Sequence, residues 1–124
     1  MSSSSKMTAL LKEKVQQIKN IEDEANAVLA AGDSEKYRDL MRQKAEVLSG
    51  LASSAEAVSA DLPPEVRREV MSKLNNFSQN AQNSLDLDST FYMSALLYPD
   101  DHKKGEPNNL EKLLGFVQGQ ELVV

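Results

Sequence analysis

Apolar residues recur at helical spacing in the first part of the chain. Over residues 7–28 they stand three, four or seven positions apart, so they share one face of a helix, and Lys14 occupies the one missing step. Gly32 favours the left-handed conformation that ends a helix, and Asp33 or Ser34 is suited to cap the next one. A turn this short joins antiparallel helices. The pattern therefore predicts a helical hairpin, whose first apolar stripe consists of Met7, Leu11, Ile18, Ile21, Ala25 and Val28.

A second apolar stripe follows the turn, with Lys44 in its missing place. It predicts one helix over residues 37–62, in which the small residues between positions 49 and 60 allow a neighbouring backbone to approach closely. We expect Lys14 and Lys44 to lie at the bundle edge with their ammonium groups in solvent, although a lysine in such a stripe can also fix the register against a partner helix. The stripe consists of Tyr37, Met41, Leu48, Leu51, Ala55, Val58 and Leu62.

Two prolines end this pattern and start a third helix. Proline is disfavoured in helix interiors but suits a first turn, so we expect the helix to begin near Pro64. The apolar period continues through Tyr92 and Ala95 if one polar step is tolerated, which predicts a helix reaching about Leu97 with an irregularity at residues 86–89. Its main stripe consists of Val66, Val70, Leu74, Phe77, Ala81 and Leu85.

A polar segment bracketed by two prolines separates this helix from a last one. Residues 99–107 have the composition of an exposed linker. Asn108 and Glu111 resemble a capping box, in which each side chain binds the backbone N–H of the other residue at a helix start. The helix that follows has about ten residues, which is marginal alone in water, so it must dock on the bundle, a second copy or a partner, and we expect it to be mobile. Its apolar face consists of Leu110, Leu113, Leu114 and Val117.

These elements predict an all-α protein. We expect an antiparallel bundle of three long helices, with the short C-terminal helix as a separate, mobile element. The 124 residues suit one domain, and an aromatic content of 5% with no tryptophan favours helix over sheet. The expected organisation is a disordered tail at residues 1–5, the bundle at 6–98, the linker at 99–107, and the C-terminal helix and tail at 108–124.

The charge pattern narrows the range of partners. The net charge is −5 and neither half of the chain has an excess of Lys and Arg, so we expect neither nucleic acid nor an anionic membrane as a partner. No apolar run approaches the roughly 18 residues needed to cross a bilayer. No signal peptide is recognisable and the chain has no cysteine, which favours the cytoplasm. The acidic residues of the first helix lie opposite much of its apolar stripe, so we expect them to face solvent; they include Glu13, Glu22, Asp23 and Glu24.

No residue pattern predicts catalysis, a metal site or a cofactor. His102 lies beside Asp100 and Asp101, but no second histidine and no cysteine can complete a coordination sphere. Asp86 and Asp88 lack the glycine and the glutamate of a calcium loop, and the chain has no nucleophile elbow or phosphate-binding glycine loop. We therefore expect a non-enzymatic protein whose distinctive chemistry is apolar and aromatic.

That apolar chemistry is concentrated at residues 91–98, which are apolar nearly all round with only Ser94 polar. A helix of this kind has to be covered on every side, either by its own core and the C-terminal helix or by another chain. An amphipathic partner helix could replace the C-terminal helix on this surface. We expect the partner-binding residues to be Phe91, Tyr92, Leu96, Leu97, Leu110, Leu113, Leu114 and Val117.

Over residues 6–118 the chain resembles the FlgN/FliT-type flagellar export chaperones. The resemblance rests on the two hairpin stripes, the Leu-Pro-Pro-Glu restart at residues 62–65 and the helix-end stretch 83–98 that leads into a Pro-Asp turn. It implies a non-enzymatic cytoplasmic chaperone of type III secretion, which binds a helical segment of a flagellar filament-junction or cap subunit through its third helix and the region after it. The alternative is a structural homodimer or adaptor, in which two hairpins form a four-helix core without a client.

Overall fold

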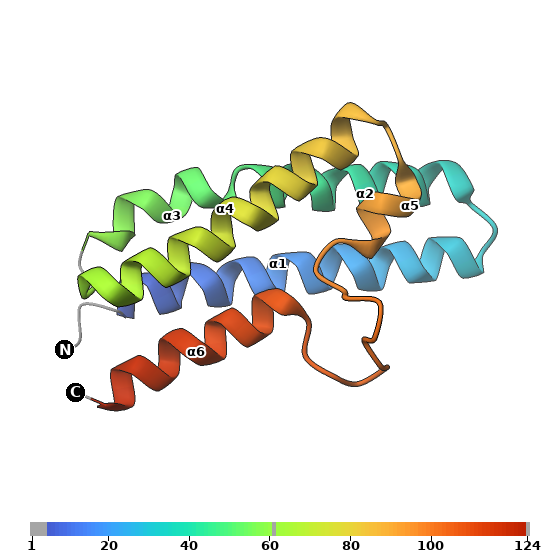
Figure 1. The fold of residues 1–124 in the computed structure, drawn as a ribbon. Helices are drawn as coiled ribbons and strands as arrows, with labels where there is room; N and C mark the ends of the chain where they lie inside the picture. Colours follow the sequence, from blue (N-terminus) through green and yellow to red (C-terminus); the bar gives the residue numbers. More distant parts are fainter. Residues whose placement is uncertain (1–4, 61, 124) are drawn as a thin grey trace.

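A computed structural model describes residues 5–60 and 62–123, and the described chain consists of helices, turns and loops without a strand (Figure 1). The predicted all-α class is confirmed. The predicted tail at residues 1–5 lies outside the described residues, except for Ser5, which begins the first helix. None of the described helices is both long and apolar enough to cross a membrane. The elements are α1 (Ser5–Ala30), α2 (Ser34–Ser49), α3 (Leu51–Ser59), α4 (Pro64–Asp86), α5 (Thr90–Ala95) and α6 (Asn109–Val123).

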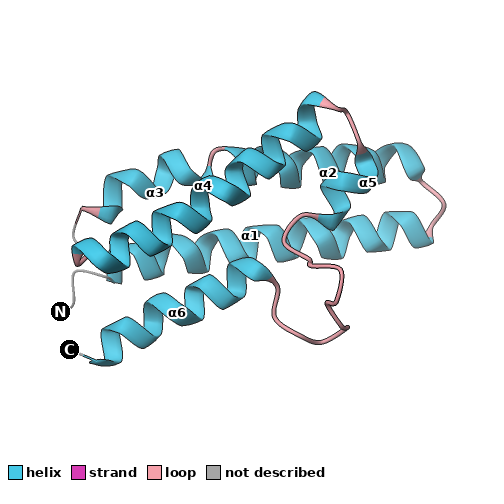
Figure 2. Ribbon diagram, in the orientation of Figure 1, coloured by secondary structure: helices cyan, strands magenta, loops and turns pink. Residues whose placement is uncertain are grey.

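The turn between α1 and α2 folds as the sequence predicts. Gly32 has a φ of +86°, and the N–H groups of Gly32 and Asp33 donate to the carbonyls of Leu29 and Val28, which are the hydrogen bonds of a Schellman motif. The Asp33 side chain accepts from the Lys36 N–H at 3.0 Å and caps α2. As a result, α1 and α2 run side by side as an antiparallel hairpin (Figure 2).

The second predicted helix is interrupted at Gly50, so the expected single helix over residues 37–62 is wrong. The hydroxyl of Ser78 in α4 accepts from the N–H of Ala52 at 3.0 Å and donates to the carbonyl of Leu48 at 2.8 Å. Ala52 and Leu48 are four residues apart, so this hydroxyl replaces the helical hydrogen bond that would join them. The backbone of Gly50 stays close to helical, with φ −91° and ψ −3°, and the apolar stripe continues across the break into α3.

The third predicted helix stops at Asp86 and does not continue to Leu97. Asp88 takes the left-handed conformation, with φ +50°, and the N–H groups of Asp88 and Ser89 donate back to carbonyls in the last turn of α4. This second Schellman motif turns the chain. The Ser89 side chain then caps a separate helix, α5, by accepting a backbone N–H. The irregularity predicted at residues 86–89 is therefore a helix end, and α5 lies against α2 (Figure 1).

The apolar stripes of α1, α2–α3 and α4 form the core. Their members are buried or half-buried as predicted, up to Leu85 in α4. The predicted continuation of the α4 stripe through Tyr92 and Ala95 is wrong, because both residues lie on the exposed side of α5. The α4 stripe therefore ends with α4, and α5 contributes Met93 to a core cluster with residues of α1 and α2.

α6 completes this core. It packs against α1 and α4, and the buried Leu110, Leu113 and Val117 belong to the same cluster as the stripes of those helices. Asn108 and Glu111 form the predicted capping box: the Asn108 side chain accepts the Glu111 N–H at 2.9 Å, and the Glu111 side chain accepts the Asn108 N–H at 3.0 Å. α6 has 15 residues, so it is longer than predicted.

Candidate protein-binding site

The structure separates the predicted partner-binding residues into two groups. The first group belongs to α5 and the segment after it. Phe91 and Tyr92 are 74% and 53% exposed, whereas Leu96 is half-buried and Leu97 is buried. The second group packs against α1 and α4 from α6 and consists of Leu110, Leu113, Leu114 and Val117.

Of the two covers considered for residues 91–98, the C-terminal helix covers only the segment after α5 and not α5 itself. α6 lies along α1 and α4 and does not contact α5 within the described chain. Its first turn reaches the segment after α5 instead, where the N–H of Asn109 donates to the carbonyl of Leu97 at 2.9 Å. The physical reason is the turn at the end of α4, which places α5 against α2 and leaves Phe91 and Tyr92 in solvent.

A groove of about 430 Å³ is lined by residues of α4, α5, the segment after α5 and the first turn of α6. Its lining combines apolar side chains with a row of asparagines from α4. Leu87, which is 66% exposed, and Tyr92 stand at its rim. The groove is lined by Leu48, Asn76, Phe77, Asn80, Asn83, Ser84, Leu87, Tyr92, Ala95, Leu96, Leu97, Tyr98 and Asn109.

The lining of this groove is uncharged. Charged residues make up 27% of the chain, yet none of the described residues that form the groove is Asp, Glu, Lys or Arg. A ligand that carried a charge into the groove would lose hydration without gaining a counter-charge, which costs free energy. The groove therefore favours an uncharged ligand.

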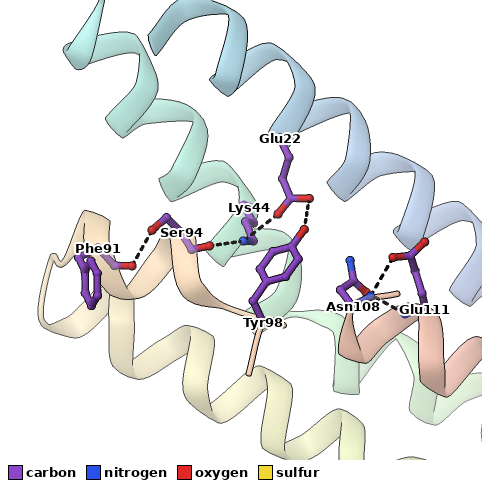
Figure 3. A network of polar contacts seen from close by, with 7 residues as sticks. All are labelled: Glu22, Lys44, Phe91, Ser94, Tyr98, Asn108 and Glu111. Atoms are coloured by element: carbon purple, nitrogen blue, oxygen red, sulfur yellow. Dashed lines mark hydrogen bonds and ion pairs between the residues drawn. The ribbon is translucent and has the colours of Figure 1, made fainter. Parts of the chain in front are cut away.

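A buried polar network holds α5 in place beside the groove (Figure 3). Lys44 of α2 is fully buried, and its ammonium group lies 3.0 Å from a carboxylate oxygen of Glu22 on α1 and donates to the carbonyl of Ser94 on α5 at 3.0 Å. The Tyr98 hydroxyl donates to the other carboxylate oxygen of Glu22 at 2.8 Å, and the Lys44 ammonium lies 5.0 Å from the centre of the Tyr98 ring. The network joins α1, α2 and α5, and Tyr98 also lines the groove.

Two expectations from the sequence are wrong in this network. The ammonium group of Lys44 does not reach solvent, and the Glu22 side chain is only 19% exposed because it turns inward to meet it. Lys14, the other lysine of the stripes, is half-buried and contacts Gln17 at the helix surface, as expected of a lysine at a bundle edge. The difference between the two lysines is the carboxylate that a neighbouring helix supplies to Lys44.

Burial shifts the acid–base properties of two members of the network. It lowers the pKa of Lys44, and the charge of Glu22 and the hydrogen bond to Glu22 oppose that shift. Burial, together with the hydrogen bond to Glu22 and its charge, raises the pKa of Tyr98 to about 12. The ammonium group is directed at a carboxylate and a backbone carbonyl, so its role in the fold is to position α5.

The segment after α5 holds the sole histidine in structural contacts. The rings of His102 and Tyr98 pack edge to face with centres 4.8 Å apart, and His102 Nε2 lies 2.9 Å from the carbonyl oxygen of Glu106. Over the part of the chain that the structure describes, no group of three or more His, Cys, Asp or Glu side chains is arranged to hold a metal ion. These contacts extend the polar network from Tyr98 into the loop.

Sequence reasoning did not assign Leu87, the asparagine row or the Glu22–Lys44 pair to the site. A signal existed for the asparagines, because positions 76, 80 and 83 share a helix face. A signal also existed for Lys44, which occupies a core step of its stripe. The sequence contained no signal for its partner, because Glu22 belongs to another helix.

Comparison of the chain with protein-family models, with curated proteins and with solved structures gave no match. The function is therefore inferred from the geometry and chemistry of the groove.

Proposed function

We propose that this protein is a non-enzymatic, protein-binding helical bundle, which holds an apolar segment of a partner polypeptide in the groove between α4 and α5. The observation that carries the proposal is the exposure of Leu87, Phe91 and Tyr92 beside a groove with an uncharged lining. Clustered exposed apolar side chains mark interaction sites, whereas isolated ones are ordinary. Phe91 and Tyr92 form part of such a cluster, with ring centres 5.6 Å apart.

Leu87 and Tyr92 supply much of the binding free energy in this proposal. Complete burial of an exposed leucine contributes roughly 1.5 to 3 kcal/mol, and Leu87 has 66% of its surface left to bury. We therefore expect Leu87 to contribute about 1 to 2 kcal/mol to binding, which corresponds to a change of about five- to thirtyfold in affinity. Tyr92 adds an aromatic anchor of the kind that is enriched among the most important residues of interfaces.

The fixed position of α5 supports this proposal. The ion pair between Arg42 of α2 and Asp88 links the turn between α4 and α5 to α2. The network of Lys44, Glu22 and Tyr98 holds the other end of α5. A groove whose walls are already in place loses less conformational entropy when a partner binds, and so binds more tightly for the same contacts.

The scaffold in this proposal is the three-helix antiparallel bundle of α1, α2–α3 and α4, with α6 packed on it. The resemblance to FlgN/FliT-type export chaperones supplies a candidate partner in the cytoplasm, a segment of a flagellar filament-junction or cap subunit. A structural homo-oligomer is the second candidate. The exposed side chains of Leu87, Phe91 and Tyr92 favour the homo-oligomer, because in a symmetric dimer they would cover those of the second copy.

Fluorescence polarisation with labelled segments of flagellar junction and cap subunits tests the proposal. Leu87→Ser should weaken binding about five- to thirtyfold, because a serine hydroxyl cannot replace the apolar contacts of a leucine that becomes buried on binding. Leu29→Ser is the matched control, since Leu29 is an exposed leucine of α1 that does not line the groove; it should leave affinity unchanged. Segments that bind both variants equally would contradict the proposal. A dimer in sedimentation velocity that Leu87→Ser dissociates would favour the homo-oligomer instead.

A further inference from the structure

The α4 wall of the groove carries a row of asparagine side chains. Asn76, Asn80 and Asn83 lie four and three residues apart, so they share one face of the helix, and all three line the groove. Within the described chain, the side chains of Asn76 and Asn80 form no hydrogen bond with another residue. Asn83 accepts from Gln79 at 3.0 Å. The row thus presents amide groups that the protein itself leaves available.

An asparagine side chain is the chemical complement of a peptide group, because it offers a carbonyl acceptor and two N–H donors. A partner helix cannot use these groups along its length, since its own backbone N–H and C=O groups are already bonded internally. An extended segment has backbone groups free on both edges and gains hydrogen bonds from them. The asparagine row therefore favours an extended partner over a helical one.

The spacing of the asparagines fits an extended chain. Asn76 and Asn80 are separated by about 6 Å along the helix axis, at a rise of about 1.5 Å per residue. Peptide groups on one edge of an extended chain repeat every two residues, which is about 6.6 Å. The two side chains can therefore pair with successive peptide groups on that edge. Alternate side chains of the segment then point toward the apolar lining at Phe77 and Leu96.

We propose that the groove binds an extended, uncharged, apolar segment of a partner polypeptide, whose backbone pairs with Asn76 and Asn80. This inference rests on the proposed function and specifies the conformation and the charge of the partner. The uncharged lining selects against Asp, Glu, Lys and Arg in the segment, because each would be desolvated without a counter-charge. Leu87 and Tyr92 at the rim contribute the apolar contacts that the asparagines lack.

A random library of 12-residue peptides displayed on phage, selected on the full chain, supplies the probe. Selected peptides should be uncharged at their centre and rich in β-branched residues and proline, which favour extended conformations. Synthetic copies should bind more weakly when α-aminoisobutyric acid, which favours helix, is placed at the centre. Asn80→Ala should weaken binding roughly two- to tenfold, because one neutral hydrogen bond is lost. Asn75→Ala is the matched control, an exposed asparagine of α4 outside this groove, and should bind as the wild type does.

An ester in place of one central peptide bond removes a single N–H donor and tests the pairing directly. The ester at the paired position should weaken binding to the wild type roughly two- to tenfold and leave binding to Asn80→Ala unchanged, because the two changes remove the same hydrogen bond. Peptides that bind more tightly with α-aminoisobutyric acid, and equally to the wild type and Asn80→Ala, overturn the extended-segment inference. If their binding still depends on Leu87, the proposed function survives. A selection that yields no peptide sensitive to Leu87→Ser overturns both.

Discussion

Replacing Lys44 with methionine removes a buried ammonium group and leaves an unbranched side chain of similar shape in its place. In the wild type that ammonium group lies 3.0 Å from both Glu22 and the carbonyl oxygen of Ser94 and 5.0 Å from the centre of the Tyr98 ring. Methionine can form neither polar contact. The Glu22 carboxylate then keeps the Tyr98 hydroxyl as a donor but loses its counter-charge. We expect the free energy of unfolding to fall.

The burial of the Glu22–Lys44 pair sets the expected decrease in the free energy of unfolding. Removing one partner of a buried ion pair costs about 3 to 5 kcal/mol, because the remaining charge is left uncompensated. Glu22 keeps 19% of its side chain in solvent, so the lower end applies and Lys44→Met should cost about 3 kcal/mol. Glu22→Gln should cost about 3 kcal/mol or more, because it leaves a fully buried ammonium group with neutral partners. The double variant contains no buried charge and should be more stable than either single variant.

Urea unfolding followed by far-ultraviolet circular dichroism measures the four proteins of this cycle at neutral pH. Lys36→Met is the control, because Lys36 pairs with Glu24 at 3.6 Å on the surface and should change stability by less than about 1 kcal/mol. Two outcomes would refute the reasoning. One is a loss below about 1 kcal/mol for Lys44→Met, and the other is a double variant in which the two single losses simply add.

The remaining predictions concern α6 and alkaline pH. Gly115→Ala and Gly119→Ala should each raise the free energy of unfolding in urea by about 0.8 to 1 kcal/mol, because alanine is the better helix former. An added Cβ at either position meets no atom within 4 Å. If stability does not rise, these positions are not as open as the structure shows. Asn108→Ala should lower stability by about 1 kcal/mol in the same assay, because it removes the N-cap acceptor of α6, and an unchanged midpoint would argue against that cap. Folding raises the pKa of Tyr98 from 10.0 to about 12, so the folded state binds the hydroxyl proton more tightly than the unfolded state does. This difference should stabilise the fold below pH 10. The free energy of unfolding should then fall by roughly 2 kcal/mol as the pH rises toward 12. The free energy of unfolding of Tyr98→Phe, measured over the same pH range, should lack this decrease. If Tyr98→Phe loses stability with pH as the wild type does, other groups cause the decrease.

Much of the fold was predictable because it depends on residues close together in the chain. The apolar stripes, the turn at Gly32 and the Asn108–Glu111 capping box each follow from spacings of a few residues. The break at Gly50 was not predictable, because its cause is the hydroxyl of Ser78 from another helix, and the apolar period runs through it unchanged. The end of α4 was only partly predictable, because aspartate there takes the left-handed position that glycine usually occupies.

The candidate site was less predictable because it depends on contacts between distant residues. The apolar character of Phe91 and Tyr92 is visible in the sequence, but their exposure depends on where the chain turns after α4. Lys44 has the pattern of an edge lysine until Glu22 is placed opposite it by the packing of α1 on α2. The groove itself exists only because α5 and the first turn of α6 reach the same end of α4.

The packing of α6 against α1 also has a consequence for synthesis on the ribosome. One core cluster joins Leu11 of α1 to Leu110 of α6, which are about a hundred residues apart in the chain. At roughly 5 to 20 residues per second, a ribosome needs about 5 to 20 s to add that many residues. Within this interval, α1 and α4 are both translated once the ribosome has passed residue 86, whereas α6, which packs on both helices, begins only at residue 109. The nascent chain is therefore most prone to aggregate just before residues 109–123 are made, and a pause in translation there would prolong the exposure.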